Sequence, residues 1–215
     1  MLESLRETLY SLIFPTETRC LACGAPIQGG ALCPQCASRW PLGNGGIRIA
    51  CVETADWAYA GLPYTPVVRS MIHRYKFQCV RAAADVLAES MIRIMPEEVD
   101  ALVPVPLHPR RERWRGFNQS QLLCERIAAA TGVEVLPALS RIRHTREQAL
   151  LDVRMRELNV RDSMRVCVPV QGLRLLVVDD VVTTGSTAME CVNELLHAGA
   201  GWVGVLCAAH PIGQS

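Results

Sequence analysis

The fold of this 215-residue chain is decided by the stretch Leu175-Leu176-Val177-Val178-Asp179-Asp180-Val181-Val182-Thr183-Thr184-Gly185-Ser186-Thr187. Four consecutive apolar residues predict a buried strand of the kind found in parallel sheets. The hydroxyl residues and the glycine that follow predict a loop that opens into a helix. A strand, a loop and a helix in this order are typical of an α/β protein.

The loop has the composition of a phosphate-binding site. Backbone amides at a helix N-terminus favour an anion, and Thr183, Thr184, Ser186 and Thr187 add hydroxyl donors. Gly185 allows the backbone to approach a phosphate closely. The sequence therefore predicts that this loop binds a monoester phosphate.

Two acids, Asp179 and Asp180, stand just before the loop. Carboxylates in such a place accept hydrogen bonds from sugar hydroxyls, as acids do for ribose in dinucleotide-binding folds. A phosphate and a ribose are thus expected side by side. In the alternative interpretation the two acids only cap a helix, which leaves the run of hydroxyl residues unexplained.

Around this stretch, short apolar runs alternate with helical patterns. Strands are expected over Ala101–Val105, Val133–Leu136 and Trp202–Ala208. Helices are expected from Thr65-Pro66 through Tyr75, over about Val80–Ile94, and over Gln119–Ala130 and Ser186–His197. The alternation predicts a parallel, Rossmann-like sheet covered by helices, with ligand sites beyond the carboxyl ends of its strands.

Four of the ten cysteines form two pairs with a gap of two residues each, Cys20 with Cys23 and Cys33 with Cys36. This spacing predicts a tetrahedral zinc site, and four protein ligands make that zinc structural. The alternative is a set of labile thiols or one redox pair. The other six cysteines are expected mostly as small buried hydrophobic residues, namely Cys51, Cys79, Cys124, Cys167, Cys191 and Cys207.

Two units are expected along the chain. Residues 1–45 hold an amphipathic helix and the four-cysteine zinc module, and residues 46–215 hold the main domain, with glycines 43, 45 and 46 at the boundary. Charged residues interrupt the first apolar positions, and no apolar run reaches the length of a membrane helix. We therefore expect a cytoplasmic protein without membrane insertion, in a reducing compartment that suits thiolate ligands.

The charge is uneven although the net charge is only +1. The segment from Arg110 to Arg165 holds twelve arginines against seven acids, and Lys76 is the only lysine of the chain. Such a segment is expected to meet an anionic ligand, with a solvated helix face as the alternative.

The stretch from Leu175 to Thr187 resembles the signature by which type I phosphoribosyltransferases bind phosphoribosyl pyrophosphate (PRPP). More of the chain resembles the ComF family of that superfamily, which is linked to natural competence and to the use of DNA as nutrient. The resemblance rests on the four cysteines and on four further motifs: Lys76-Phe77, Val103-Pro104-Val105-Pro106-Leu107-His108, Arg115-Gly116-Phe117-Asn118-Gln119, and the group Gln148, Leu151, Arg156 and Asn159. The chain departs from the pattern at Cys79, where glycine is usual, and at Met164, where phenylalanine is common.

The resemblance implies transfer of phosphoribose from PRPP with loss of diphosphate, and a magnesium ion bound with PRPP. It implies diphosphate contacts from Arg110, Arg111, Arg113 and Arg115, with Lys76 and Arg74 as weaker candidates. It also implies a hood segment, about residues 139–165, in which Arg141, Arg143, Arg154 or Arg156 contacts the diphosphate. No general base stands out, and His73, His108 and His144 are candidate proton carriers.

Three functions remain open at this level. The first is a phosphoribosyltransferase with an unknown nitrogen acceptor, which would serve nucleotide salvage. The second is a regulator that senses PRPP without catalysis. The third is a single-stranded DNA-binding factor that works with competence proteins, in which Arg110–Arg115 contact phosphates while Trp114 and Phe117 stack on bases.

Overall fold

The computed structural model describes residues 18–41, 45–141 and 164–212. At its centre lies a sheet with the strand order β3-β4-β10-β9-β5-β6. The strands are β3 (Ile47–Arg48), β4 (Trp57–Pro63), β5 (Ala101–Pro104), β6 (Glu134–Val135), β9 (Arg174–Val181) and β10 (Trp202–His210). Only β3 is antiparallel to its neighbour. The predicted α/β class with a parallel sheet is therefore confirmed.

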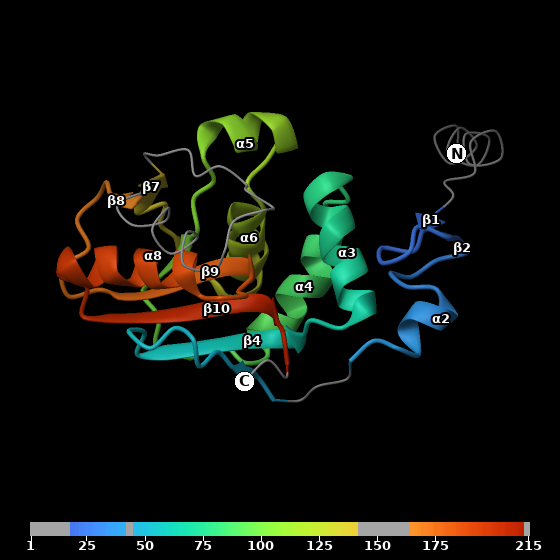
Figure 1. Cartoon of the computed structure of the whole chain (residues 1–215), viewed down its shortest axis with the longest axis horizontal. Coiled ribbons are helices and arrows are strands. Elements are labelled where there is room, and N and C mark those ends of the chain that lie inside the picture. Colours follow the sequence, from blue (N-terminus) through green and yellow to red (C-terminus); the bar gives the residue numbers. More distant parts are fainter. Residues whose placement is uncertain (1–17, 42–44, 142–163, 213–215) are drawn as a thin grey trace, which may run out of the picture.

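Helices cover both faces of this sheet (Figure 1). The helices α3 (Pro66–Phe77), α4 (Ala83–Ile92) and α6 (Gln119–Thr131) share a hydrophobic cluster with Leu176 and Val178 of β9. The helix α8 (Ser186–His197) shares a second cluster with Leu175 and Val177. Because successive side chains of a strand point to opposite faces, α8 lies across the sheet from the other three helices.

The elements predicted within the described residues are present, with two informative differences in their bounds. The helix expected from about residue 80 begins at Ala83, because Cys79 has a left-handed conformation with φ 53° and interrupts the chain between α3 and α4. The central strand continues past the expected end at Val178, because Val181 still pairs with Ala209 of β10. The two acids therefore belong to the strand itself.

The structure also contains elements that the sequence analysis did not anticipate. The arginine-rich residues 110–115, for which the sequence analysis names no helix, lie in the short helix α5 (Pro109–Arg115), which begins at a proline and ends at Gly116 with φ 77°. The strands β7 (Leu139–Arg141) and β8 (Met164–Val166) pair in antiparallel fashion at the two ends of the predicted hood segment. The strand β4 was also missed.

The six additional cysteines divide by location. Cys124, Cys191 and Cys207 are buried, as expected, and Cys51 is partly buried. Cys79 and Cys167 are exposed because they lie in connections outside the sheet, so the expectation of burial is wrong for these two.

The cysteine module folds as β1 (Thr18–Arg19), β2 (Pro26–Ile27) and α2 (Pro34–Ala37), with β1 and β2 antiparallel. Figure 1 shows it beside α3 at one end of the molecule. The predicted boundary between residues 1–45 and 46–215 stays a prediction. The amphipathic helix expected near the N-terminus and Gly43 lie outside the described residues. Within the described part, no helix has the length and apolar character needed to cross a membrane.

Candidate functional site

Residues 181–187 run from the end of β9 to the first turn of α8 and are called the phosphate loop below. It borders a cavity of about 70 Å³ that is also lined by Asp179 and Ala188. Thr184 Oγ1 lies 3.1 Å from Ser186 Oγ, and α8 starts at Ser186, so hydroxyl groups and the first backbone N–H groups of a helix gather here. Of the residues predicted to bind phosphate and ribose, all except Asp180 line this cavity.

Gly185 is required for two reasons that the structure makes visible. Its φ of 78° lies in the left-handed region, which disfavours a side chain. A Cβ atom at this position would also come within 2.8 Å of the carbonyl oxygen of Cys51. The Cys51 thiol donates a hydrogen bond of 3.5 Å to the Thr183 carbonyl. The segment before β4 therefore packs against the phosphate loop, a contact that the sequence did not indicate.

The two acids of β9 have different partners. Asp179 Oδ1 accepts hydrogen bonds from Ser120 Oγ at 3.0 Å and from the backbone N–H of Asp180 at 2.8 Å. The buried carboxylate of Asp180 has its Oδ1 2.7 Å from the ammonium nitrogen of Lys76. Burial, and after it the charge of Asp180, raises the pKa of Asp179 to about 7. Asp179 therefore exchanges its proton near neutral pH.

Lys76 is brought to the acids by the last turn of α3. Its side chain is only 22 % exposed, and burial by itself lowers the pKa of a lysine. The ion pair with Asp180 outweighs this effect and raises the pKa of Lys76 above its ordinary value. The only lysine of the chain, a weak candidate from the sequence, is thus the cation nearest to the acid pair among the described residues.

Ser120 is a site residue that sequence reasoning missed. Asn118 caps α6 by accepting hydrogen bonds from the N–H groups of Ser120 and Gln121, at 3.0 and 3.4 Å. The cap holds the Ser120 hydroxyl at the start of the helix, where it reaches Asp179. In the sequence, the only indication of this role is the helix-capping Asn118 two residues before Ser120.

The arginines of α5 differ in their surroundings. Arg115 Nη1 donates to Gln119 Oε1 at 3.1 Å, and the positive charge of Arg115 acts to lower the pKa of Lys76. Arg110 and Arg113 are exposed. Of these three predicted diphosphate contacts, Arg115 is therefore the one whose charge is shown to act on Lys76.

The hood segment is described only at its two ends. Arg141, at the end of β7, has a lowered pKa because of burial and then because of the nearby charge of Arg111. His108 caps α5, since its Nδ1 accepts from the N–H of Arg110 at 3.2 Å. The remaining candidates of this region lie outside the described residues, namely Arg143, His144, Arg154 and Arg156.

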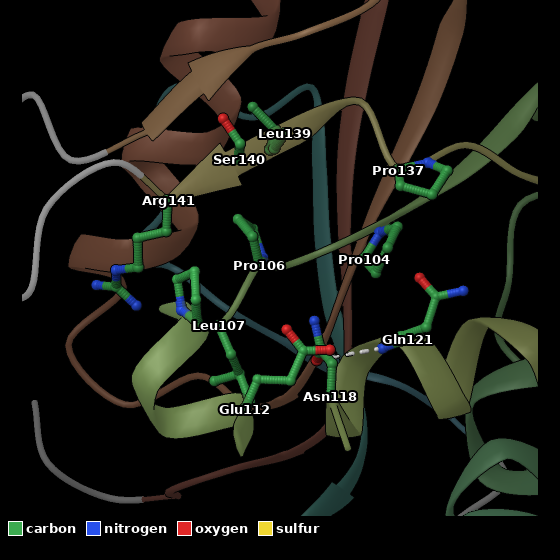
Figure 2. A pocket seen from close by; sticks show the side chains of 11 residues that line it. Pro104, Pro106, Leu107, Glu112, Asn118, Gln121, Pro137, Leu139, Ser140 and Arg141 are labelled. Atoms are coloured by element: carbon green, nitrogen blue, oxygen red, sulfur yellow. Dashed lines mark hydrogen bonds between the residues drawn. The ribbon is translucent and has the colours of Figure 1, made fainter. Parts of the chain in front are cut away.

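A second cavity, of about 380 Å³, lies between β5, α5, α6 and β7 (Figure 2). Its lining residues are Pro104, Pro106, Leu107, Pro109, Glu112, Asn118, Gln121, Pro137, Leu139, Ser140 and Arg141. Prolines and leucines form its apolar walls. Figure 2 shows Glu112 extending from α5 and Arg141 from β7.

The predicted metal ligands meet at one point. The Sγ atoms of Cys20, Cys23, Cys33 and Cys36 all lie within 4.8 Å of one another, and those of Cys23 and Cys33 are 3.7 Å apart. A tetrahedral zinc ion with Zn–S bonds of about 2.3 Å places its sulfur ligands roughly 3.8 Å apart. The four thiols therefore fit a metal ion such as zinc.

The module is attached to α3 by side chains of that helix. Ser70 Oγ donates to the Ala22 carbonyl at 2.7 Å, and Arg74 Nη1 donates to the Cys20 carbonyl at 3.3 Å. Gly24 packs so closely on the Arg74 guanidinium that a Cβ would collide with it. Arg74, a weak diphosphate candidate, thus contacts the cysteine module.

An exposed group of aromatic and arginine side chains joins the end of α3 to α5 and the start of α6. We call it the aromatic–arginine surface; its members are His73, Phe77, Arg81, Trp114, Arg115 and Phe117. Trp114 is 72 % and Phe77 45 % exposed, and their ring centroids are 6.1 Å apart. Arg115 lies over Phe77 at 5.1 Å and Arg81 over Phe117 at 4.9 Å.

Comparison with known proteins gives clear relatives, although no protein-family model matches the chain. The chain is 35 % identical over 206 residues to the DNA utilization protein YhgH of Salmonella typhi, covering 87 % of this chain and 88 % of that protein. It is 34 % identical over 101 residues to competence protein F of Haemophilus influenzae, covering 45 % and 44 %. It is 21 % identical over 212 residues to competence protein ComFC of Bacillus subtilis, covering 87 % and 82 %.

Among solved structures, the chain is similar to glutamine PRPP amidotransferase of Bacillus subtilis, with 25 % identity and a TM-score of 0.43. The similarity covers 60 % of this chain but only 26 % of that enzyme. The chain therefore belongs to the ComF family of DNA utilization and competence proteins.

Proposed function

We propose that the protein binds PRPP with magnesium at the phosphate loop and transfers its phosphoribosyl group to a nitrogen acceptor. The observation that supports this most directly is the 70 Å³ cavity, which has Asp179 on its wall. A volume of roughly two water molecules suits one phosphate group. The 5′-phosphate then fills the cavity, and the ribose hydroxyls reach Asp179 and Asp180.

The bound magnesium ion supplies charge neutralisation to the diphosphate. Carboxylate oxygens are the ligands that this ion prefers, and Asp179 and Asp180 provide them. When Asp180 turns to the ligand, its ion pair with Lys76 loosens. The ammonium group of Lys76 then turns to the diphosphate.

In the transfer, the acceptor nitrogen forms a bond to the anomeric carbon. The bond from that carbon to the diphosphate oxygen breaks with its electron pair, and the proton of the nitrogen goes to solvent. Within the family, this activity would serve DNA utilization or nucleotide salvage in the cytoplasm.

Calorimetric titration of PRPP and magnesium into the zinc-loaded protein tests the binding step. Saturable binding is expected for the intact protein and is expected to be lost in an Asp179→Ala, Asp180→Ala variant. Glu97→Gln, a change at an exposed carboxylate remote in sequence from the loop, is the matched control and should bind like the parent. Absence of binding by the parent protein would contradict the proposal.

The aromatic–arginine surface favours a second function, the binding of single-stranded DNA. Exposed Phe77 and Trp114 offer stacking faces for bases, and the arginines beside them offer contacts for phosphates. The names of the relatives, DNA utilization and competence proteins, agree with such a ligand. In this function the competence proteins are the expected partners.

Fluorescence anisotropy with a labelled single-stranded oligonucleotide tests this second function. Because stacking contributes about 1–3 kcal/mol per base, Trp114→Ala is expected to weaken binding about 10-fold. Affinity should also fall steeply with salt. Ile212→Ala removes an exposed apolar side chain elsewhere and should leave affinity unchanged. Equal affinity of the Trp114→Ala variant and the parent would count against this surface.

A further inference from the structure

The phosphate loop is tied to β10 by a histidine side chain that the proposed function does not use. His210, the last residue of β10, places its Nδ1 2.7 Å from the carbonyl oxygen of Val182. Because a carbonyl oxygen only accepts hydrogen bonds, Nδ1 carries the proton and donates. The backbone N–H of Val182 in turn donates to the Ala209 carbonyl at 3.3 Å. Both polar groups of the Val182 backbone are therefore held by the end of β10.

His210 is itself held in place by β4, which lies beside β10 (Figure 1). Its carbonyl accepts a hydrogen bond of 2.9 Å from the N–H of Tyr64, and its partner in the register of the two strands is Pro63. On the other side of β10, the last pair in the register with β9 is Ala209 with Val181. The imidazole thus adds one more hydrogen bond to this ladder, at the point where β9 becomes the phosphate loop.

The next carbonyl of the loop is also bound by a side chain. The Cys51 thiol donates to the Thr183 carbonyl at 3.5 Å, although a thiol is a weak donor. Val182 and Thr183 line the phosphate-loop cavity, whereas His210 and Cys51 do not. Two consecutive carbonyls of the cavity wall are therefore bound by groups that lie outside the lining, and the bond from His210 is the shorter of the two.

The orientation of a carbonyl decides where the next N–H group points. The peptide bonds of the described residues are trans, and in a planar trans peptide the C=O and the N–H point in opposite directions. When the Val182 carbonyl is held outside the cavity, the N–H of Thr183 points into it. A concave run of backbone N–H groups binds an anion, whereas a carbonyl turned inward would repel it.

We infer that His210 is a positioning residue, which keeps the N–H of Thr183 directed at the 5′-phosphate by binding the Val182 carbonyl. The inference rests on the proposed function, since it takes the phosphate loop as the PRPP site. His210 acts through one peptide group of the loop and not by contact with the ligand. The property that matters is a hydrogen-bond donor at the position of Nδ1.

Three substitutions of His210 test this role by calorimetric titration of PRPP and magnesium into the zinc-loaded protein. His210→Asn keeps an N–H donor close to the position of Nδ1 and should bind like the parent. His210→Gln carries its amide one bond further from the backbone, and His210→Ala has no donor. Both should bind about 5-fold more weakly, which corresponds to the loss of one hydrogen bond. The exposed His197 of α8 provides the control, and His197→Ala should bind like the parent.

Nuclear magnetic resonance supplies two measurements that depend neither on PRPP nor on the folding of a variant. In isotope-labelled parent protein, the long-range correlations of the His210 ring should show the proton on Nδ1. Addition of inorganic phosphate to the parent should shift the backbone amide signal of Thr183. In His210→Ala, this shift should be smaller.

The outcomes separate the inference from the proposed function. If the parent binds PRPP and His210→Ala binds it equally well, the positioning role is wrong and the PRPP site stands. The same conclusion follows if His210→Asn is as weak as His210→Ala, or if the ring proton lies only on Nε2. If phosphate shifts the Thr183 signal in a His210-dependent way but PRPP does not bind, the transferase function fails and the positioning role remains. If neither PRPP nor phosphate binds, both fail.

Discussion

At the scale of single residues, Cys79 carries a measurable strain. Among the described residues it is the only one other than glycine with a positive φ, 53°. The left-handed conformation costs a residue with a side chain about 1–2 kcal/mol, whereas the extra freedom of glycine in the unfolded chain costs about 0.5–1 kcal/mol. Cys79→Gly should therefore raise the free energy of unfolding by up to about 1 kcal/mol, measured by urea denaturation. Cys167→Gly, at an exposed cysteine with ordinary φ, should lower it.

Asp179 should make PRPP binding depend on pH. Burial raises the pKa of its carboxyl group to about 7, so the group is mostly protonated at pH 6 and mostly ionised at pH 8. If the ligand and its magnesium ion need the carboxylate, affinity should rise about 10-fold from pH 6 to pH 8. Calorimetry at these two pH values measures the change. In Asp179→Asn the rise should disappear, and a persistent rise would mean that another group titrates.

The carboxyl group of Asp179 also makes the free energy of unfolding depend on pH. In the folded protein the pKa of Asp179 lies above its ordinary value of 3.8, so the folded state holds the proton more tightly than the unfolded state does. The free energy of unfolding from this group therefore falls as pH rises from about 4 to about 7. Asp179→Asn should stabilise the protein at pH 8 relative to the parent, as thermal melts at that pH would show.

At the scale of elements, α3 connects the metal module to the acid pair. Ser70 and Arg74 hold the module on one side of the helix, and Lys76, in the last turn, holds Asp180 on the other. Removal of the metal with a chelator, followed by dialysis into magnesium buffer, should therefore weaken PRPP binding several-fold. Addition of zinc should restore it, because the four thiolates reassemble the module.

The variant Ser70→Ala separates the binding of the metal from the attachment of the cysteine module to α3. The variant keeps all four cysteines but loses the hydrogen bond to Ala22, so it should bind zinc normally and PRPP more weakly than the parent. Ser38→Ala, which loses only a hydrogen bond to Gln35 inside the module, is the matched control. If the metal-free protein binds PRPP as well as the zinc-loaded protein, α3 does not couple the two sites.

The elements that could be predicted are those whose signal is local. A few neighbouring residues are enough to predict the apolar strand before Asp179, the hydroxyl loop and the helix at Ser186. The same holds for the spaced cysteines. Contacts between distant segments could not be predicted. Cys51 against Gly185 and Ser120 against Asp179 join positions 134 and 59 residues apart, and only the strand order of the sheet brings them together.

At the scale of the whole molecule, β10 holds the sheet together because it lies between β4 and β9. Deletion of residues 202–215 would leave both neighbours with unpaired edges and would expose the cluster around Val177. Such a truncated protein should lack a cooperative thermal transition by circular dichroism. Deletion of residues 213–215 alone, which follow β10 in the sequence, should leave the melting temperature unchanged.

The position of β10 also has a consequence for synthesis. Trp57 of β4 pairs with Gly204 of β10, a partner 147 residues further along the chain. While the ribosome makes those residues, β4 is paired with the two-residue strand β3 on one edge, and the edge that later pairs with β10 stays unpaired. The nascent chain thus has an unpaired, aggregation-prone strand edge for most of its translation. We therefore expect the yield of folded protein in cells to depend on chaperones that shield such segments.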